Sequence, residues 1–490
     1  MSRRATPLAL AAIVAAGLVL RIVYAQQSLL GDELFTLDHA GEGSFGAMMD
    51  SADRVEYTPP LYFVLAWLVA KLGDPETAIR VPAIVLGTAT IPLVFVLARR
   101  AAEGAGRRGA AAGRDAAAGR GEAAGLVAAA AFALSPFALF YGSEARSYGA
   151  AAFFVALAAV LLLGALEHGG RGRWVAFSAA LAGIALSHYT AIAAAVWLGA
   201  WAAYARRDRI RPLAAACAAA AAAFLVWVPF APTFSAPDVV GAFWPLTPSN
   251  TASALARSLF GVNPPVALAD APGVLPAAVL TALALAGAAM VAARLWAGRA
   301  EALRSPLGML TGLALVTPAA LLAYSLVSTD VFVARSLFPT APAVFAAIGA
   351  GLATLPRPAL AACAAAGLLA LGAGALAARG PDARRPQYEE AAAFIERATR
   401  PGDPVLDAEV FPERAPRRAL EIHLDRTVVE TDVADPRPAL ARAERAAVAG
   451  FPSVRGGAEF DLPVRAGMRQ VERRVFRGSV DLHVAIYARP

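Results

Sequence analysis

Long apolar runs, separated by short charged connections, fill roughly the first 380 residues of the chain. Apolar runs of about 18 or more residues predict helices that cross a bilayer. A large soluble helical core would give a similar pattern, but charged residues make up only 17% of the chain, below the quarter typical of soluble domains. We expect eleven membrane helices, at residues 7–25, 79–98, 124–141, 148–166, 174–187, 190–205, 212–234, 274–296, 306–328, 336–355 and 359–378.

One further apolar run is too short to span. Leu61 to Leu72 gives about 12 residues, or about 18 Å of helix, against a hydrocarbon core of about 30 Å. The run follows Pro59-Pro60, and proline is common at helix starts. We interpret it as an interfacial or re-entrant helix.

The pattern changes after Arg379 to that of a soluble domain. Apolar positions recur with helical spacing from Tyr388 to Thr399. Short strands are expected at Val405–Leu406, Thr427–Glu430, Val471–Phe476 and Val480–Tyr487. The fold class is therefore a mainly α, polytopic membrane protein, with a membrane domain over residues 1–379 and a small α/β domain over residues 380–490.

Arginine marks alternate connections between the predicted helices, which is the positive-inside pattern. It places these connections in the cytoplasm, including the Ala/Gly/Arg-rich segment 101–123, which we expect to be a loop. The segments left outside are 26–78, 142–147, 188–189, 235–273, 329–335 and everything after 379.

Composition narrows the functional class. The net charge is +7, but from Pro381 onward 18 arginines balance 18 acidic residues, so the excess lies in the membrane part and orients helices. No basic face interleaved with aromatics is present, so nucleic acid is not an expected partner. Cys217 and Cys363 lie inside apolar runs and indicate neither a disulfide framework nor a metal site.

The first residues also bear on location. Ser2-Arg3-Arg4 precedes an apolar run to Tyr24, and Val23-Tyr24-Ala25 resembles a signal-peptidase site. We favour an uncleaved anchor because the run is long enough to span. The abundance of alanine and arginine is typical of GC-rich bacterial genomes, so the expected location is a bacterial inner membrane.

The pair Asp32-Glu33 opens the first outer segment, a few residues after the first predicted helix. Two adjacent carboxylates at a membrane surface repel each other and lose solvation. A carboxylate there can act as general base on a hydroxyl group or bind a cation. The alternative is a solvated pair that only marks a helix end.

Several further motifs accompany the pair on the predicted outer side. Their sequences are Glu56-Tyr57-Thr58-Pro59-Pro60-Leu61-Tyr62-Phe63, Ala78-Ile79-Arg80-Val81-Pro82-Ala83, Tyr141-Gly142-Ser143-Glu144-Ala145-Arg146-Ser147-Tyr148, His188-Tyr189 and Phe332-Val333-Ala334-Arg335-Ser336-Leu337. Together with Asp32-Glu33 they resemble the GT-C superfamily of membrane glycosyltransferases. The nearest branch resembles the protein O-mannosyltransferases and aminoarabinose transferases, of the bacterial glycosyltransferase family 39 type. Two positions depart from the pattern, Thr58 and Ser336.

The resemblance implies a GT-C fold and transfer of a sugar from a polyprenyl-phosphate carrier to an acceptor hydroxyl on a glycan, lipid or protein outside the membrane, with inversion. It implies Asp32 as the general base and Glu33 as a group that orients the acceptor or neighbouring donors. Arginine binds phosphate well because it stays charged and offers paired donors. Arg335 is the first candidate for the phosphate. Further candidate substrate contacts are Arg80, Glu144, Arg146, His188, Tyr189, Tyr57 and Tyr62.

Each candidate contact has a structural alternative. Arg335 and Arg80 could anchor helix ends, Glu144 and Arg146 could form a local ion pair, and His188 could be a packed histidine. Tyrosines at these positions are also typical of the interfacial belt. No cluster has metal spacing, so no cofactor is expected, although Asp32, Glu33 and Glu144 could share a divalent ion as in the oligosaccharyltransferase branch.

Two other functional classes compete with a glycosyltransferase. A transporter would show repeated halves and charges inside its spans, whereas here the charged motifs gather at the outer mouth. A membrane scaffold or sensor with an extracytoplasmic domain would not need an intact site.

Overall fold

The computed structural model describes most of the chain. The described residues are 5–29, 31–103, 111–230, 245–261, 270, 272–408, 419–424, 428–430, 435–452 and 457–490. They form two compact units. The first, here the helical unit, comprises Met1–Ala25 and Glu56–Ala378, and the second, here the sheet unit, comprises Gln26–Val55 and Arg379–Pro490.

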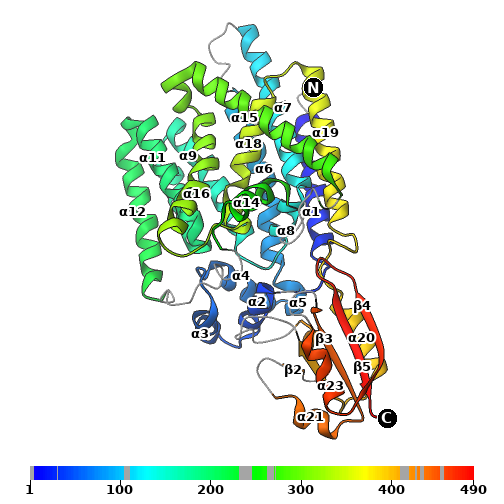
Figure 1. The fold of residues 1–490 in the computed structure, drawn as a ribbon. Helices are drawn as coiled ribbons and strands as arrows, with labels where there is room; N and C mark the ends of the chain where they lie inside the picture. The colour runs from blue at the N-terminus through cyan, green and yellow to red at the C-terminus, as the bar shows by residue number, and fades with distance from the viewer. Residues whose placement is uncertain are drawn as a thin grey trace. The chain divides into compact units, whose positions relative to one another are not determined.

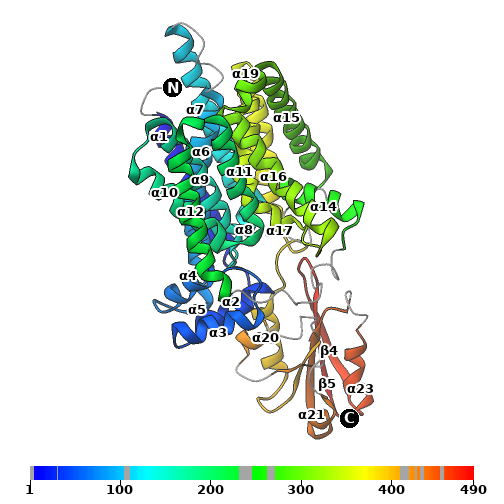
Figure 2. The same ribbon diagram turned by 90° about the vertical axis from the view of Figure 1, so that its left-hand side faces the viewer.

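The helical unit contains helices at all eleven positions where the hydropathy pattern predicts them (Figures 1 and 2). Seven helices in the described part of the chain are long and apolar enough to cross a membrane by themselves. The protein is thus a multi-pass membrane protein. The eleven are α1 (Ala5–Tyr24), α6 (Val81–Glu103), α7 (Ala111–Leu134), α9 (Tyr148–His168), α10 (Arg171–Ser187), α11 (Ile192–Ala205), α12 (Ile210–Trp227), α15 (Val274–Leu303), α16 (Pro306–Val327), α18 (Ala341–Leu352) and α19 (Arg357–Ala377).

Short elements connect these helices. The predicted short helix is α4 (Leu61–Ala70), which begins directly after Pro60. The others are α5 (Pro75–Ala78), α8 (Pro136–Tyr141), η1 (Tyr189–Ala191), η2 (Arg207–Arg209), η3 (Val228–Phe230), α14 (Pro248–Phe260), α17 (Ala334–Leu337) and η4 (Phe338–Thr340).

Two connections differ from the sequence prediction. The prediction of a loop over 101–123 is wrong where the chain is described, because α6 extends to Glu103 and α7 begins at Ala111. Alanine and arginine are strong helix formers, and they outweigh the glycines of this segment. In the predicted outer segment 235–273, the structure describes α14, whose first turn is capped by the Thr247 hydroxyl.

The third predicted span is broken into two helices. Pro136 lacks an amide hydrogen and occupies the first turn of α8, while the Ser135 hydroxyl accepts a hydrogen bond from the Ala138 amide at 3.4 Å. The break turns the chain toward the motif at residues 141–148, and every residue of α8 is buried.

A buried arginine lies beside this break. Arg21, in the last turn of α1, is fully buried and donates hydrogen bonds to the carbonyl oxygens of Gly17 and Ala138. A Cβ atom on Gly87 of α6 would lie 2.7 Å from the Gly142 oxygen and 3.0 Å from Arg21 Nε. Glycine is therefore required here for close approach of α6 to the turn after α8.

The sheet unit combines helices from both ends of the chain with a five-stranded sheet. Its helices include α2 (Asp32–Gly41), α3 (Phe45–Val55), α20 (Tyr388–Ala398), α21 (Arg437–Arg442) and α23 (Leu462–Arg465), with the short turns η5 (Glu421–His423) and η6 (Ala458–Asp461). The strands are β1 (Val405–Ala408), β2 (Val429–Glu430), β3 (Arg445–Gly450), β4 (Arg469–Phe476) and β5 (Leu482–Ala488), in the order β2-β1-β3-β5-β4. β1 pairs in parallel with β2 and with β3. β5 pairs antiparallel with β3 and with β4.

Both faces of this sheet are covered. One face carries an apolar cluster that includes Val448 and Tyr487 and is closed by residues near α21, η6 and α23. The helix α20 packs on the other face (Figure 2). There the ring centroids of Phe394 and Phe476 lie 6.0 Å apart. The predicted small α/β fold is confirmed, with β3 as a strand that the sequence pattern did not reveal.

Candidate active site

A buried ion pair joins two of the outer motifs. Arg146, in the turn before α9, donates hydrogen bonds from both terminal nitrogens to the Glu56 carboxylate, one of them at 2.8 Å and the other shorter. Both side chains are less than a tenth exposed. The Phe63 ring of α4 lies under the guanidinium, 5.5 Å from its centre. Arg146 thus pairs with Glu56, a residue from a distant part of the chain.

His188 lies at the junction of α10 and η1. Its Nδ1 accepts a hydrogen bond from the Thr190 amide at 3.3 Å, so the imidazole caps η1. The Tyr148 ring packs against it at 5.2 Å between centroids. Burial, followed by the positive charges of Arg146 and Arg335, lowers the pKa of His188 to about 3, although Glu56 opposes the shift.

Arg335 lies in α17, just before η4 and α18, and is half-buried. Its charge acts on His188, as does that of Arg146, so both arginines are in the neighbourhood of one imidazole. The elements agree with this, because η1 contacts both α17 and η4. The structure therefore brings together three predicted contacts, Arg146, His188 and Arg335, with Glu56 as a fourth member. We call these four residues the cationic cluster.

Two of the predicted substrate contacts, Tyr62 and Arg80, donate hydrogen bonds to backbone carbonyl groups. The fully buried Tyr62 donates from its hydroxyl to the Ile79 carbonyl at 2.8 Å, which ties α4 to the start of α6. Arg80 donates to the Ala25 carbonyl at 2.5 Å, just beyond the end of α1. A cation is favourable there because the last carbonyls of a helix carry partial negative charge.

The other predicted substrate contacts in the helical unit are Tyr57, Tyr189 and Glu144, and their solvent exposure differs. Tyr57 is exposed and lies between Glu56 and the start of α4. Tyr189 accepts a hydrogen bond on its hydroxyl from Trp227 Nε1 at 3.1 Å. Glu144 is half-buried in the turn after α8, where its carbonyl accepts from the Arg146 amide.

Asp32 and Glu33 belong to the sheet unit, where they form the first turn of α2. Acidic residues at that position favour the positive end of the helix dipole. The Glu33 side chain is fully buried and forms an ion pair with Arg385 of the same unit. Asp32 is half-buried.

Glu56 was included in a motif in the sequence analysis but was assigned no role there. Its signal was weak, because its partner lies 90 positions away along the chain. The clue available was an acidic residue a few positions before an apolar helix, where an unpaired charge would be costly.

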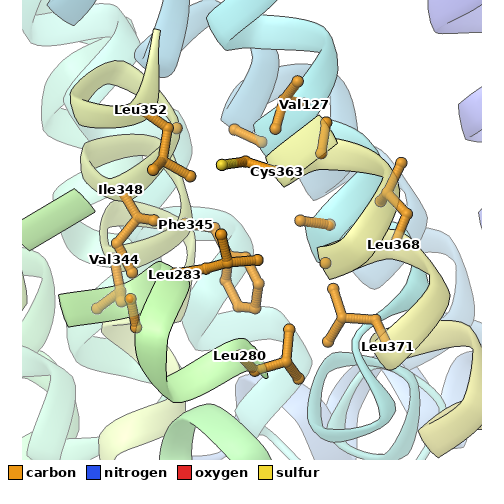
Figure 3. A pocket seen from close by; sticks show the side chains of 16 residues that line it. Val127, Leu280, Leu283, Val344, Phe345, Ile348, Leu352, Cys363, Leu368 and Leu371 are labelled. Atoms are coloured by element: carbon orange, nitrogen blue, oxygen red, sulfur yellow. The ribbon is translucent and has the colours of Figure 1, made fainter. Parts of the chain in front are cut away.

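Within the described ranges, neither a metal-binding group nor an apolar pocket among the membrane helices contributes to this site. Among the residues that the structure describes, no three His, Cys, Asp or Glu side chains are grouped to hold a metal ion. The apolar pocket lies among α7, α15, α18 and α19, and side chains such as Phe345, Ile348 and Cys363 line it (Figure 3). Its lining contains none of the predicted site residues and offers no acid or cation for group transfer.

Comparison with known proteins adds two observations. The sequence profile of a family described as Protein O-mannosyl-transferase TMEM260 N-terminal domain matches residues 59–212. This segment is under a third of the chain, and it contains α4, the 141–148 turn and His188-Tyr189. A comparison with curated proteins gives no match.

Among solved structures, the chain is similar to ArnT from Cupriavidus metallidurans in the apo state, at 15% identity and a TM-score of 0.53 over 97% of each chain. ArnT bound to undecaprenyl phosphate gives 16% identity, a TM-score of 0.53 and the same coverage. This protein has the GT-C fold. The archaeal oligosaccharyltransferase AglB from Archaeoglobus fulgidus is a weaker match, with 12% identity and a TM-score of 0.48 over 96% of this chain and 73% of that one. The GT-C resemblance expected from the motifs is confirmed.

Proposed function

We propose that the protein is an integral membrane glycosyltransferase that moves a sugar from a polyprenyl-phosphate carrier to an acceptor hydroxyl. The observation that carries the proposal is the cationic cluster, which places two arginines and a buried carboxylate near one histidine in a chain with a GT-C fold. The solved structure of ArnT with undecaprenyl phosphate supports a carrier of this class.

Arg335 is the group proposed to bind the carrier phosphate. The charge of Arg146 is balanced by the two hydrogen bonds to Glu56, and His188 is neutral because its pKa is low. Arg335 lies beside this neutral imidazole, and its guanidinium keeps its positive charge at every physiological pH. An arginine suits this role because the leaving phosphate needs a permanent positive charge and paired donors.

Asp32 is proposed as the general base. The acceptor hydroxyl gives its proton to the Asp32 carboxylate while its oxygen attacks the anomeric carbon. The bond from that carbon to the phosphate oxygen breaks, and polyprenyl phosphate leaves with the electron pair. Attack opposite the leaving group inverts the anomeric centre. The reaction balances with donor and acceptor alone, so no cofactor is proposed.

The other predicted contacts keep different proposed roles. Tyr57, Glu144 and Tyr189 are proposed to contact donor or acceptor, whereas Tyr62 and Arg80 are proposed to act by holding backbone in place. The proposed location is a bacterial inner membrane, with Asp32 and the sheet unit on the outer side. This follows from the positive-inside distribution of arginine.

Purified protein incubated with radiolabelled polyprenyl-phosphate sugars and a panel of hydroxyl acceptors tests the proposal. We expect transfer by the wild type and loss of transfer in Asp32→Asn with normal folding. Asp38→Asn, in the same helix α2, is the matched control and should transfer normally. Full activity of Asp32→Asn would show that the base is misassigned, and no transfer from any donor would contradict the function.

A further inference from the structure

Arg385 makes three contacts with the segment that carries Asp32. Its amide donates to the Gln27 side-chain oxygen at 2.9 Å, and its Nη1 donates to the Ser28 carbonyl at 3.1 Å. The same Nη1 forms the ion pair with Glu33. All four residues belong to the sheet unit, although Arg385 lies more than 350 positions from the others.

These contacts lie on both sides of Asp32 in the chain. Gln27 and Ser28 precede it by a few residues, and Glu33 follows it directly. One arginine therefore fixes the entry to α2 and its first turn at once. The residue before Asp32 is Gly31, with φ 58° and ψ −123°, a conformation that a side chain would strain. The chain thus enters α2 through a non-helical residue, Gly31, and Asp32 is the first residue of the helix.

Burial makes the Glu33 contact an obligatory one. The Glu33 side chain is fully buried and that of Arg385 is 10% exposed. A buried carboxylate that loses its cation is strongly disfavoured, so the two side chains stay together in the folded protein. The Glu33 carboxylate is engaged by Arg385, and this pairing agrees with a role for Glu33 in orienting a neighbouring hydrogen-bond donor.

Arg385 is itself held by the C-terminal sheet. The carbonyl of the preceding residue, Arg384, accepts a hydrogen bond of 2.7 Å from the Ser479 amide in the turn between β4 and β5. A Cβ on Gly478, in the same turn, would lie 3.0 Å from the Pro386 nitrogen, so the two segments pack closely. The link therefore runs from the β4–β5 turn through residues 384–386 to the first turn of α2.

From these contacts we infer that Arg385 is a positioning residue for Asp32, and that the C-terminal sheet serves the reaction by holding the catalytic carboxylate in place. The inference rests on the proposed role of Asp32 as the base. It gives the C-terminal part of the chain a function that needs no contact with the donor. Misplacement of a reacting group by about 1 Å lowers rates about 100-fold, so a small loosening of α2 has a large effect.

Transfer kinetics of the full-length protein test the inference. We expect Arg385→Met to lower kcat about 10- to 100-fold while the affinity for polyprenyl phosphate, measured directly by displacement, is unchanged. Arg385→Lys should recover much of kcat because it restores the charge. Arg397→Met is the control, because it removes an exposed arginine of α20 in the same unit, and it should keep kcat within about twofold.

A second variant and a second measurement distinguish a loss of positioning from misfolding of the protein. Removing both charges in Glu33→Gln with Arg385→Met avoids an unpaired buried carboxylate, and it should fold yet still show a low kcat. Hydrogen exchange at residues 31–36 should be faster in both Arg385→Met proteins than in Arg397→Met, whether or not transfer is assayed. Unchanged exchange and kcat in Arg385→Met would overturn the inference. Loss of activity in Asp32→Asn alone would then leave the proposed function intact, whereas full activity of Asp32→Asn would contradict that function.

Discussion

Glu56 and Arg146 lie 90 positions apart in the chain and form a doubly hydrogen-bonded ion pair with almost no solvent exposure. The pair joins the segment before α4 to the turn before α9. His188 lies near this pair, and the charge of Arg335 also acts on the His188 imidazole. Because this cluster brings together four distant parts of the chain, its residues should be sensitive to substitution in different, separable ways.

Glu56→Gln should destabilise the helical unit strongly. The change leaves the Arg146 guanidinium buried without its charge partner, and breaking such a pair costs about 3–5 kcal/mol. Thermal unfolding in detergent should show a clearly lower Tm. Asp208→Asn removes one partner of the exposed Arg206–Asp208 pair and is the control, for which we expect a Tm close to that of the wild type. A similar small shift for both variants would contradict the assigned importance of Glu56.

Gly87→Ala should destabilise the contact between α6 and the turn after α8. The added methyl group would lie 2.7 Å from the Gly142 oxygen and 2.9 Å from its Cα, and overpacking of this kind costs about 1–3 kcal/mol. Gly164→Ala in α9 is the matched control, because a Cβ there meets nothing within 4 Å. We expect a lower Tm for the first variant and an equal or higher Tm for the second. Equal values would refute the close approach.

His188 should make the protein less stable as the pH falls. The unfolded chain binds a proton on this imidazole near pH 6.5, whereas the pKa in the folded protein is about 3. Between these values the unfolded state holds more protons, so the free energy of unfolding decreases as the pH drops from about 6.5 toward 3. The groups that shift this pKa are Arg146, Arg335 and Glu56. Tm measured from pH 8 to pH 5 should fall more steeply for the wild type than for His188→Gln, and parallel curves would disprove the assignment.

Arg335→Gln should weaken binding of polyprenyl phosphate without changing the fold. Loss of a charge-assisted hydrogen bond costs about 1.5–3 kcal/mol, which corresponds to about 10- to 100-fold in Kd. Arg335→Lys should lie between, because lysine keeps the charge but loses the paired donors. Arg357→Gln, at the exposed start of α19, is the control and should bind normally. Unchanged affinity in Arg335→Gln would exclude Arg335 as the phosphate ligand.

Hydropathy predicted the helical segments because bilayer-spanning helices need long apolar runs, and this constraint dominates local propensity. The strand β3 was missed because its sequence, Arg445–Gly450, is mostly alanine and lacks the branched and aromatic residues typical of strands. The start of α7 at Ala111 was missed because low complexity was interpreted as a loop, although alanine favours helix.

Motif reasoning found three members of the cationic cluster but not how they pair. The local residue Glu144 was considered from the sequence as a partner for Arg146, and the ion pair with Glu56 was not anticipated. The pairing of Glu33 with Arg385 likewise could not be predicted from the sequence. Both pairs depend on tertiary contacts between distant segments, which periodicity and spacing along one chain do not encode.

The cap that His188 places on η1 also fixes where its proton resides. The Thr190 amide donates to Nδ1 at 3.3 Å, and the Thr190 hydroxyl lies 2.8 Å from the same nitrogen. With Nδ1 accepting from these groups, the hydrogen of the neutral ring is on Nε2. In this tautomer Nε2 offers a hydrogen bond but cannot abstract a proton. The imidazole thus has a fixed polarity, and its hydrogen-bonding direction stays the same from mildly acidic to alkaline conditions. In this orientation His188 can offer its Nε2 hydrogen to an acceptor while Nδ1 remains engaged by Thr190.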